Sequence, residues 1–181
     1  MLTIIWAGGQ PGKISELKRM TQAEWDILRN DLPTNVKTYI DCDEDTVLIS
    51  HPDFSQKELV EISNFEGLKF SNGLIPVITK DEKGLILMQA FSDIESLELS
   101  KKESLGIYFS RSRNQLWRKG DTSGHIQKLK RILAPKDGSF VVYEVEQEGA
   151  ACHEGFYSCF FREQDRYGTK NLVPEIPFLG K

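Results

Sequence analysis

The chain alternates short apolar runs with polar turn residues, and this pattern predicts more strands than helices. An apolar run at residues 2–6 predicts a first strand, and residues 36–50 predict either one long strand or a hairpin. Residues 74–90 predict a hairpin that turns at Asp81–Gly84. Further strands are expected at residues 106–112, 126–133 and 139–147.

Helical signals are fewer than strand signals. Thr21 is followed three residues later by Glu24, which is a capping box, so we expect a helix over residues 22–31 that ends before Pro33. Two further short helices are expected at residues 55–63 and 91–102, the second with Ser92 as its cap. Because strands dominate and the few helices are mixed among them, the sequence predicts an α+β fold of mostly antiparallel strands.

The remaining segments are polar or rich in glycine and proline. We expect a turn at residues 7–13, a polar loop at 114–124 and a tail over the surface at 166–181. The turn at 7–13 is not a phosphate-binding loop, because Ala7 stands where the motif needs glycine and Ile14 stands where it needs serine or threonine.

Composition narrows the class of protein. The 181 residues suffice for one domain, or one domain with an extension, and 39% of them are hydrophobic. The net charge of −4 argues against a general nucleic-acid binder. No apolar run approaches the roughly 20 residues of a membrane helix. No basic segment precedes the apolar start, so we expect no signal peptide and a cytoplasmic location.

Residues 41–45 read DCDED and suggest a cation site. In a strand, Asp41, Asp43 and Asp45 would share one face and Cys42 would point to the other. Carboxylates crowded on one face are costly unless a cation neutralises them, and oxygen ligands suit Mg²⁺ or Ca²⁺. The EF-hand pattern fails, because threonine and proline stand where it needs glycine and glutamate. The alternative is an acidic turn between two strands.

The chain has three cysteines, Cys42, Cys152 and Cys159, an odd and small number that argues against a disulfide framework. Three is also the number of protein ligands that a catalytic zinc takes when it keeps one position for water. The spacing between the last two is wider than in the usual zinc knuckle, so buried core thiols are the alternative. His153, beside Cys152, is a candidate ligand, general base or hydrogen-bonded loop residue.

Positive charge is concentrated between Arg111 and Arg131, where Asp121 is the only acidic residue. Arginine side chains and hydroxyl groups suit phosphate oxygens, and Trp117 offers a flat face for a base or a sugar. A solvated basic loop and a small RNA-binding patch are the alternatives, and a tryptophan is more often part of a core. The basic residues are Arg111, Arg113, Arg118, Lys119, Lys128, Lys130 and Arg131.

Three long stretches of the sequence resemble the phosphoribosyl-AMP cyclohydrolase family. They are LKFSNGLIPVITKDEKGLILMQAF at residues 68–91, YFSRSRNQLWRKGDTSGHIQK at 108–128 and VEQEGAACHEGFYSCFF at 145–161. The similarity covers roughly residues 66–163. It implies a zinc-dependent enzyme of histidine biosynthesis that opens the six-membered ring of an adenine nucleotide.

One element of the family stands in an unusual place. The family has a DCDxD motif between the second and third stretches, where this chain has residues 135–139 and only Asp137 matches. The missing motif instead stands at 41–45. We therefore expect residues 1–65 to be an extension that lends a metal-binding strand to a cyclohydrolase-like domain at 66–165, followed by a tail at 166–181.

The resemblance implies two metal ions and a set of site residues. Zinc would activate the water that attacks the ring carbon between two nitrogens, with His125 or His153 moving the proton. Zinc ligands would be Cys42, Cys152 and Cys159, and Mg²⁺ ligands Asp41, Asp43 and Asp45. Substrate-binding residues would be Ser110, Arg111, Ser112, Arg113, Trp117, Lys119, Thr122, Ser123, Glu146 and Gln147.

Several alternatives remain open from the sequence. The site could close within one chain or across a homodimer, which is the expected assembly. The substrate is expected to be a small nucleotide, with neither a nucleic-acid nor a membrane partner. A hydrolase of another purine-like nucleotide and a non-catalytic paralogue with structural zinc are the competing functions. The zinc nucleobase deaminases are excluded, because both halves of their signature are absent.

Overall fold

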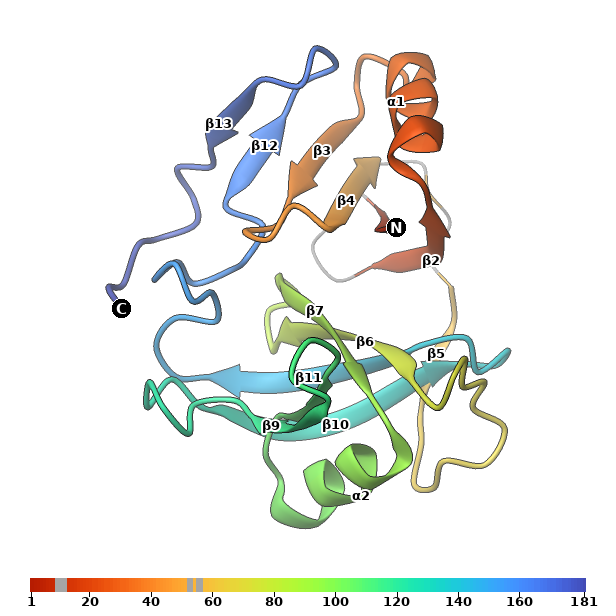
Figure 1. The fold of residues 1–181 in the computed structure, drawn as a ribbon, viewed down its shortest axis with the longest axis vertical. Coiled ribbons are helices and arrows are strands. Elements are labelled where there is room, and N and C mark those ends of the chain that lie inside the picture. Colours follow the sequence, from red (N-terminus) through yellow and green to blue (C-terminus); the bar gives the residue numbers. More distant parts are fainter. Residues whose placement is uncertain (9–12, 52–53, 55–56) are drawn as a thin grey trace.

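The computed structural model describes residues 1–8, 13–51, 54 and 57–181, which form thirteen strands and two helices (Figure 1). The helices are α1 (Gln22–Asp31) and α2 (Ile94–Glu103). The strands are β1 (Leu2–Gly8), β2 (Ile14–Met20), β3 (Lys37–Ile40), β4 (Thr46–His51), β5 (Leu59–Glu61), β6 (Ile75–Asp81), β7 (Ile86–Ser92), β8 (Ile107–Ser110), β9 (Gln115–Arg118), β10 (Gln127–Pro135), β11 (Val141–Gln147), β12 (Arg162–Gln164) and β13 (Lys170–Leu172). Neither helix is long and apolar enough to cross a bilayer, as far as the described residues go.

The strands form two large sheets and a ribbon. The first sheet has the order β13-β12-β3-β4-β1-β2, the second has the order β5-β10-β11-β6-β7, and β8 and β9 pair as a separate ribbon. Among the described strands, only the pairs β1–β4 and β6–β11 are parallel. The predicted α+β class with largely antiparallel strands is therefore confirmed.

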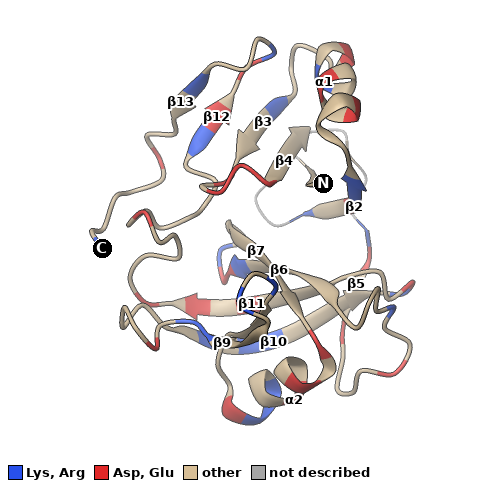
Figure 2. Cartoon of the chain, in the orientation of Figure 1, with Lys and Arg blue, Asp and Glu red and all other residues tan. Residues whose placement is uncertain are grey.

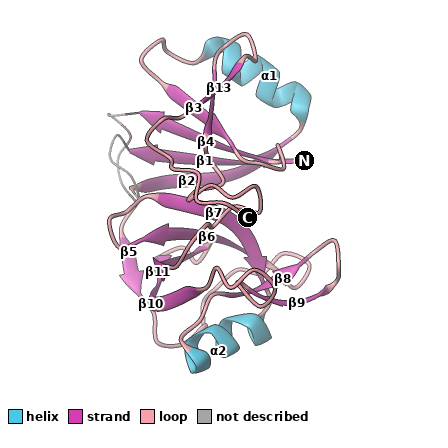
Figure 3. Cartoon of the chain, turned by 90° about the vertical axis from the view of Figure 1, so that its left-hand side faces the viewer, coloured by secondary structure: helices cyan, strands magenta, loops and turns pink. Residues whose placement is uncertain are grey.

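The two sheets lie face to face between the two helices, which gives four layers (Figure 3). Successive strand residues point to opposite faces. Ile5 of β1 therefore points between the two sheets and packs with Ile78 and Val142 of the second sheet. Ile4 points to the opposite face, toward α1 and its buried Trp25. The central strands β1, β6 and β11 are buried on both faces, which explains why they read as continuous apolar runs rather than as alternating ones.

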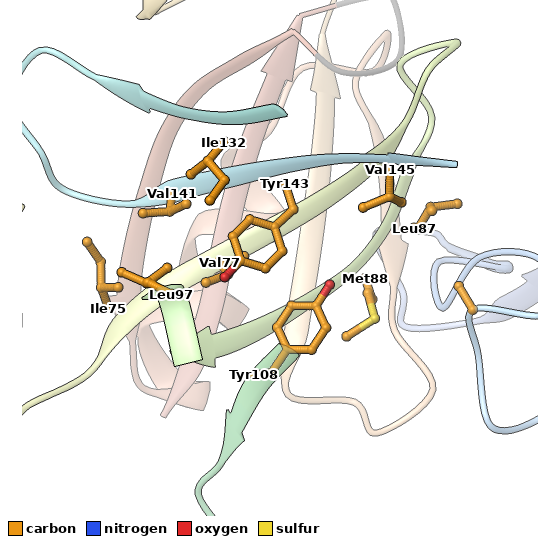
Figure 4. Packing of buried hydrophobic residues seen from close by; sticks show 11 residues of the cluster. Ile75, Val77, Leu87, Met88, Leu97, Tyr108, Ile132, Val141, Tyr143 and Val145 are labelled. Atoms are coloured by element: carbon orange, nitrogen blue, oxygen red, sulfur yellow. The ribbon is translucent and has the colours of Figure 1, made fainter. Parts of the chain in front are cut away.

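The outer face of the second sheet carries the largest cluster of buried side chains (Figure 4). Tyr108 of β8 and Tyr143 of β11 lie at its centre, with ring centroids 5.4 Å apart. The Tyr108 hydroxyl donates a hydrogen bond to Gln127 at 2.6 Å and lies 2.8 Å from the Thr79 hydroxyl. These buried polar contacts fix the ribbon β8–β9 on the sheet.

Several expected elements are confirmed. Helix α1 begins with the predicted capping box, in which the Thr21 hydroxyl accepts from the Glu24 amide and the Glu24 carboxylate accepts from the Thr21 amide. The hairpin β6–β7 turns at Asp81–Gly84, where Gly84 has a φ of 90°. A positive φ explains the glycine there, since it is the residue that adopts this conformation at no steric cost.

Other predictions are wrong. The helix expected at 55–63 is instead the short strand β5, which pairs with β10, although Ser55 and Gln56 lie outside the described residues. The cap of α2 is Asp93 rather than Ser92, because the Asp93 carboxylate accepts the Ser96 amide at 2.8 Å. Residues 9–12 of the expected turn at 7–13 also lie outside the described residues.

The loop and the tail contain more structure than expected. The polar loop at 114–124 contains β9, and the tail at 166–181 contains β13 and the buried Ile176. Strand pairing also crosses the expected boundaries, since β5 joins the second sheet while β12 and β13 join the first. The division at residues 65 and 165 stays a prediction. The chain after Cys159 returns to the first sheet, beside the loop that carries DCDED.

Candidate active site

Residues 41–45 form the loop of the β3–β4 hairpin, so the hairpin and the acidic turn are confirmed, and the alternative of a single strand through these residues is wrong. The last paired residues are Ile40 and Val47, and the Asp41 amide donates to the Thr46 carbonyl at 3.0 Å. Glu44 has a φ of 59°, the left-handed conformation, which turns the chain. In Figure 2 this acidic loop lies at the end of β3 that faces the second sheet.

The Asp41 carboxylate organises the loop from inside. It is buried and accepts the amides of Asp45 and Thr46, each at 3.1 Å. The pKa of Asp41 is raised to about 7, chiefly by burial and also by the neighbouring carboxylates of Asp45 and Asp43, against the opposing backbone hydrogen bonds. Aspartate commonly stabilises a turn in this way, because its carboxylate accepts hydrogen bonds from backbone amides that follow it in the chain.

Three cysteines from two segments meet beside this loop. Cys42 comes from the hairpin, and Cys152 and Cys159 follow β11, with the Cys159 amide held by the Leu87 carbonyl of β7 at 2.7 Å. All three thiols are free. Hydrogen bonds from Cys159 and Cys42 lower the pKa of Cys152, and the same contacts raise the pKa values of the two donors. The cluster therefore favours one thiolate already without a metal.

His153 adds a nitrogen donor at the edge of the cluster. Its Nδ1 lies 3.7 Å from the Cys42 sulfur, and its Nε2 lies 3.9 Å from an Asp43 oxygen and 3.4 Å from a Glu154 oxygen. Donor atoms of Cys42, Cys152 and His153 lie within 4.8 Å of one another, the one such group among the described residues. Sulfur and imidazole donors fit zinc.

Lys119 lies on the other side of the thiols. Burial lowers the pKa of Lys119, while the nearby Cys159, Cys152 and Cys42 act in the opposite direction. Its ammonium group also lies 5.7 Å from the centroid of the Trp117 ring. Lys119 thus connects the thiol cluster with the basic loop between β8 and β9.

A cleft of about 590 Å³ joins the acidic loop to the basic loop. Arg111 bridges its two sides, with a guanidinium nitrogen 3.4 Å from an Asp45 oxygen and its Cζ 3.9 Å from the centroid of the Phe91 ring. Arg113 donates to the Ser110 hydroxyl at 3.1 Å. The cleft is lined by Asp41, Asp43, Asp45, Gln89, Ala90, Phe91, Phe109, Ser110, Arg111, Ser112, Arg113 and Trp117.

The cleft therefore collects eight residues that the sequence predicted as metal or substrate ligands: Asp41, Asp43, Asp45, Ser110, Arg111, Ser112, Arg113 and Trp117. The three carboxylates share it without converging on one point: Asp41 bonds to the backbone, Asp43 lies near His153 and Asp45 pairs with Arg111. A Mg²⁺ ion would recruit them from these positions, and its binding stays a prediction.

The other predicted residues lie outside this lining. His125 is half-buried against Gly149, and Thr122 and Ser123 are exposed on the loop that precedes it. Glu146 pairs with Lys128 and Lys130 on the second sheet, at 3.5 and 2.6 Å. Gln147 accepts from buried Gln127 at 2.8 Å. Their roles in the site stay predictions.

Residue Asp137, the one match left at the family's usual motif position, lies elsewhere. It pairs with Lys57 at 2.5 Å and accepts the Ser139 amide and hydroxyl in the turn between β10 and β11. The Lys57 ammonium lowers the pKa of Asp137 to about 2. Asp137 is thus a turn residue in this fold.

Sequence reasoning missed several residues of the site. Gln89, Phe91 and Phe109 line the cleft from β7 and β8, and the Cζ of Arg19 lies 5.8 Å from the centroid of Phe91. The pattern of apolar residues predicted the strands β7 and β8, but it did not indicate which of their residues border the site. Arg19 lies on β2, which the sequence did not predict.

Comparison with known proteins assigns the chain to a family. The family model described as phosphoribosyl-AMP cyclohydrolase matches residues 88–161. Proteins named phosphoribosyl-AMP cyclohydrolase include one from Leptospira interrogans, 49% identical over 173 residues that cover 96% of this chain and 92% of that protein. One from Methanocorpusculum labreanum is 51% identical over 102 residues, 56% of this chain and 83% of its own length.

A third relative, from Chlorobium chlorochromatii, is 38% identical over 125 residues, 68% of this chain and 88% of that protein, and has the same name. The family match contains Cys152, Cys159 and the basic loop but not Cys42. The alignment with the Leptospira protein covers almost the whole chain and so extends into the N-terminal region that carries Cys42. This chain belongs to the phosphoribosyl-AMP cyclohydrolase family.

Proposed function

We propose that this protein hydrolyses phosphoribosyl-AMP, opening the six-membered ring of the purine, at the cleft between its acidic and basic loops. Family membership supports the reaction. The observation that carries the proposal is the meeting of Cys42, from the N-terminal hairpin, with Cys152 and His153 within 4.8 Å, with Cys159 in hydrogen-bonding contact with the two thiols. The motif missing from its usual place is thereby supplied by another part of the same chain.

The three thiols are the proposed zinc ligands. They converge from separate segments, stay free of disulfides and together favour a thiolate, which suits a soft divalent cation. These residues would hold a zinc ion, which would supply a nucleophile by lowering the pKa of a bound water molecule toward neutrality. Three ligands leave a coordination position for that water, whereas His153 as a fourth ligand would make the site structural.

The cleft provides complementary groups for a nucleotide with phosphates at both ends. Arg111 and Arg113 offer charged donors, with Ser110 and Ser112 as hydroxyl partners. Trp117 and Phe91 offer ring faces for the base. Mg²⁺ on the carboxylates of the acidic loop would neutralise their charge and bind phosphate oxygens.

In ring opening, the attacking water loses a proton and the departing ring nitrogen gains one, so a proton has to be moved between them. We propose that His153 moves this proton, because it lies beside the thiols and its Nε2 faces the carboxylates of Asp43 and Glu154. Those carboxylates orient the ring. His125 is the second candidate, since it is half-buried on the loop that follows Lys119.

We propose that all three zinc ligands come from one chain, so that the site closes without a partner subunit. The homodimer expected from the resemblance stays a prediction.

The deciding experiment is turnover of phosphoribosyl-AMP with zinc and magnesium supplied. We expect a product heavier by one water, whose formation stops when a chelator removes zinc and resumes on readdition. Related purine nucleotides run in parallel distinguish a hydrolase of another substrate. A folded, zinc-loaded protein that opens no ring would contradict the proposal and favour a structural metal.

Arg111 is expected to contribute most to substrate binding among the cleft arginines. Charge-assisted hydrogen bonds contribute about 1.5–3 kcal/mol, so Arg111→Ala should raise KM by roughly ten- to a hundredfold. Arg19→Ala should raise KM by about fivefold, because this side chain is exposed and farther from the cleft. Steady-state kinetics on phosphoribosyl-AMP measure both effects.

The matched control is Arg166→Ala, an exposed arginine outside the cleft lining. Its KM should equal that of the unchanged protein. A rise in KM for Arg166→Ala as large as for Arg111→Ala would show that KM depends on the overall charge of the protein. It would contradict the assignment of Arg111 to substrate binding.

A further inference from the structure

The segment that supplies Cys159 also continues behind the acidic loop. Two residues separate Cys159 from Arg162, the first residue of β12. Strand β12 pairs with β3 in an antiparallel register that sets Arg162 opposite Ile40, immediately before the DCDED loop. This main-chain pairing therefore places the side chain of Arg162 next to the DCDED loop.

The Arg162 guanidinium makes three hydrogen bonds to the loop. One terminal nitrogen donates to the Asp41 carbonyl at 2.6 Å and to the Cys42 carbonyl at 3.1 Å, and the other donates to the Glu44 carboxylate at 3.2 Å. Its Cζ lies 5.1 Å from the centroid of the Phe161 ring. A planar guanidinium can satisfy several acceptors in a fixed arrangement, which a lysine ammonium cannot reproduce.

Lys170 supports the same loop from β13. Its ammonium group lies 2.6 Å from the Glu44 oxygen that also accepts from Arg162. Glu44 has the left-handed backbone conformation that costs a non-glycine residue energy, and this double ion pair holds it there.

We propose that Arg162 and Lys170 form a clamp that positions the acidic loop so that the Cys42 thiol faces Cys152 and Cys159. Both are positioning residues, because they hold the backbone and the Glu44 side chain of the loop while neither of them lines the cleft itself. The clamp links the ligand that comes from the N-terminal hairpin to the segment that carries the other two. Its effect on turnover rests on the proposed function, but its effect on the thiols does not.

The test uses Arg162→Met, which removes every donor at similar length, and Arg162→Lys, which keeps the charge. Lys37→Met is the matched control, since it removes the Lys37–Glu163 pair, 3.5 Å, on the same two strands without touching the loop. Lys170→Met removes half of the Glu44 contact and leaves the bonds to the two carbonyls. Thermal unfolding of each variant verifies that it is folded.

The first measurement is Co²⁺ binding, followed by the sulfur-to-cobalt absorption of the thiolates. Loss of groups that orient metal ligands typically weakens metal affinity by about 10–100-fold, which is the fall expected for Arg162→Met. Arg162→Lys should recover part of the affinity, Lys170→Met should lose less, and Lys37→Met should match the unchanged protein.

The second measurement needs neither metal nor substrate. In the reduced, metal-free protein, alkylation of Cys42 by iodoacetamide, followed by peptide mass spectrometry, should be about tenfold faster in Arg162→Met, as expected for the loss of a charge-assisted hydrogen bond. If cobalt affinity and Cys42 alkylation are unchanged in this variant, the clamp is wrong. If both change while the unchanged protein opens no ring, the clamp stands and the proposed function fails.

If Arg162→Met does not fold, the folded Arg162→Lys and Lys170→Met variants carry the test. An intermediate loss of cobalt affinity in both, with none in Lys37→Met, supports the clamp. Unchanged affinity in both overturns it.

Discussion

Replacing Cys42 with serine should abolish zinc binding and reduce kcat/KM for phosphoribosyl-AMP by a factor of about 10³ or more. Serine keeps the size of the side chain but cannot supply the thiolate that zinc prefers. Losing the metal removes several kcal/mol of stabilisation of the transition state, and about 4 kcal/mol corresponds to 10³ in rate. Zinc content after gel filtration and steady-state kinetics measure the two effects.

The control for this prediction is Asp137→Ala, at the family's usual motif position. Asp137 bonds to Lys57 and Ser139 in the turn between β10 and β11, away from the cleft. Its replacement should change kcat/KM by less than about twofold, as expected for an exposed residue outside the site. Retention of zinc and activity in Cys42→Ser, or a large loss in Asp137→Ala, would show that the motif at 41–45 does not replace the usual one.

Local signals predicted the elements that carry their own hydrogen-bond chemistry. The capping box at Thr21 and Glu24 and the turn at Gly84 are confirmed, because each is specified by a few adjacent residues. For the DCDED segment, the sequence left open a strand with three carboxylates on one face and an acidic turn between two strands. Its acidic residues form the turn, since Asp41 satisfies the amides of Asp45 and Thr46 from inside the loop.

Strands at sheet edges were the least predictable. β5 and β13 have three residues each and carry charged side chains, so their sequences contain no period that distinguishes a strand from a helix or a loop. Both are held by pairing with distant strands, β10 and β12. Only tertiary structure could supply that information.

The sequence predicted the residue types of the candidate site, but not the residues that hold them in position. The resemblance indicated Cys152, Cys159 and the basic loop, and it gave a reason to join Cys42 to them. No pattern pointed to Arg162, which sits three residues after a ligand and gains its role from the register of β12 against β3. A hairpin loop elsewhere in the chain can supply a motif that is missing from its usual place, provided that strand pairing of this kind fixes the end of the loop.

Two inactive chains distinguish a site within one chain from a site across a dimer. Cys42→Ser and Cys152→Ser should each be inactive alone, and their co-expression should give no turnover above that of the single variants. The reason is that Cys42 meets Cys152 within the same chain, so every chain in the mixture lacks one ligand.

If Cys42 instead completed the site of a second copy, mixed dimers would contain one intact site. Random pairing in a two-fold dimer would then restore about a quarter of the normal activity. Co-expression of the unchanged chain with Cys42→Ser is the control, because it should give half the normal activity per chain in either arrangement and so verifies that the variants do not poison the assay. Recovery of turnover would require the N-terminal hairpin to reach across to a partner, and its absence in folded, co-purified chains would mean that the extension has made the site complete in one polypeptide.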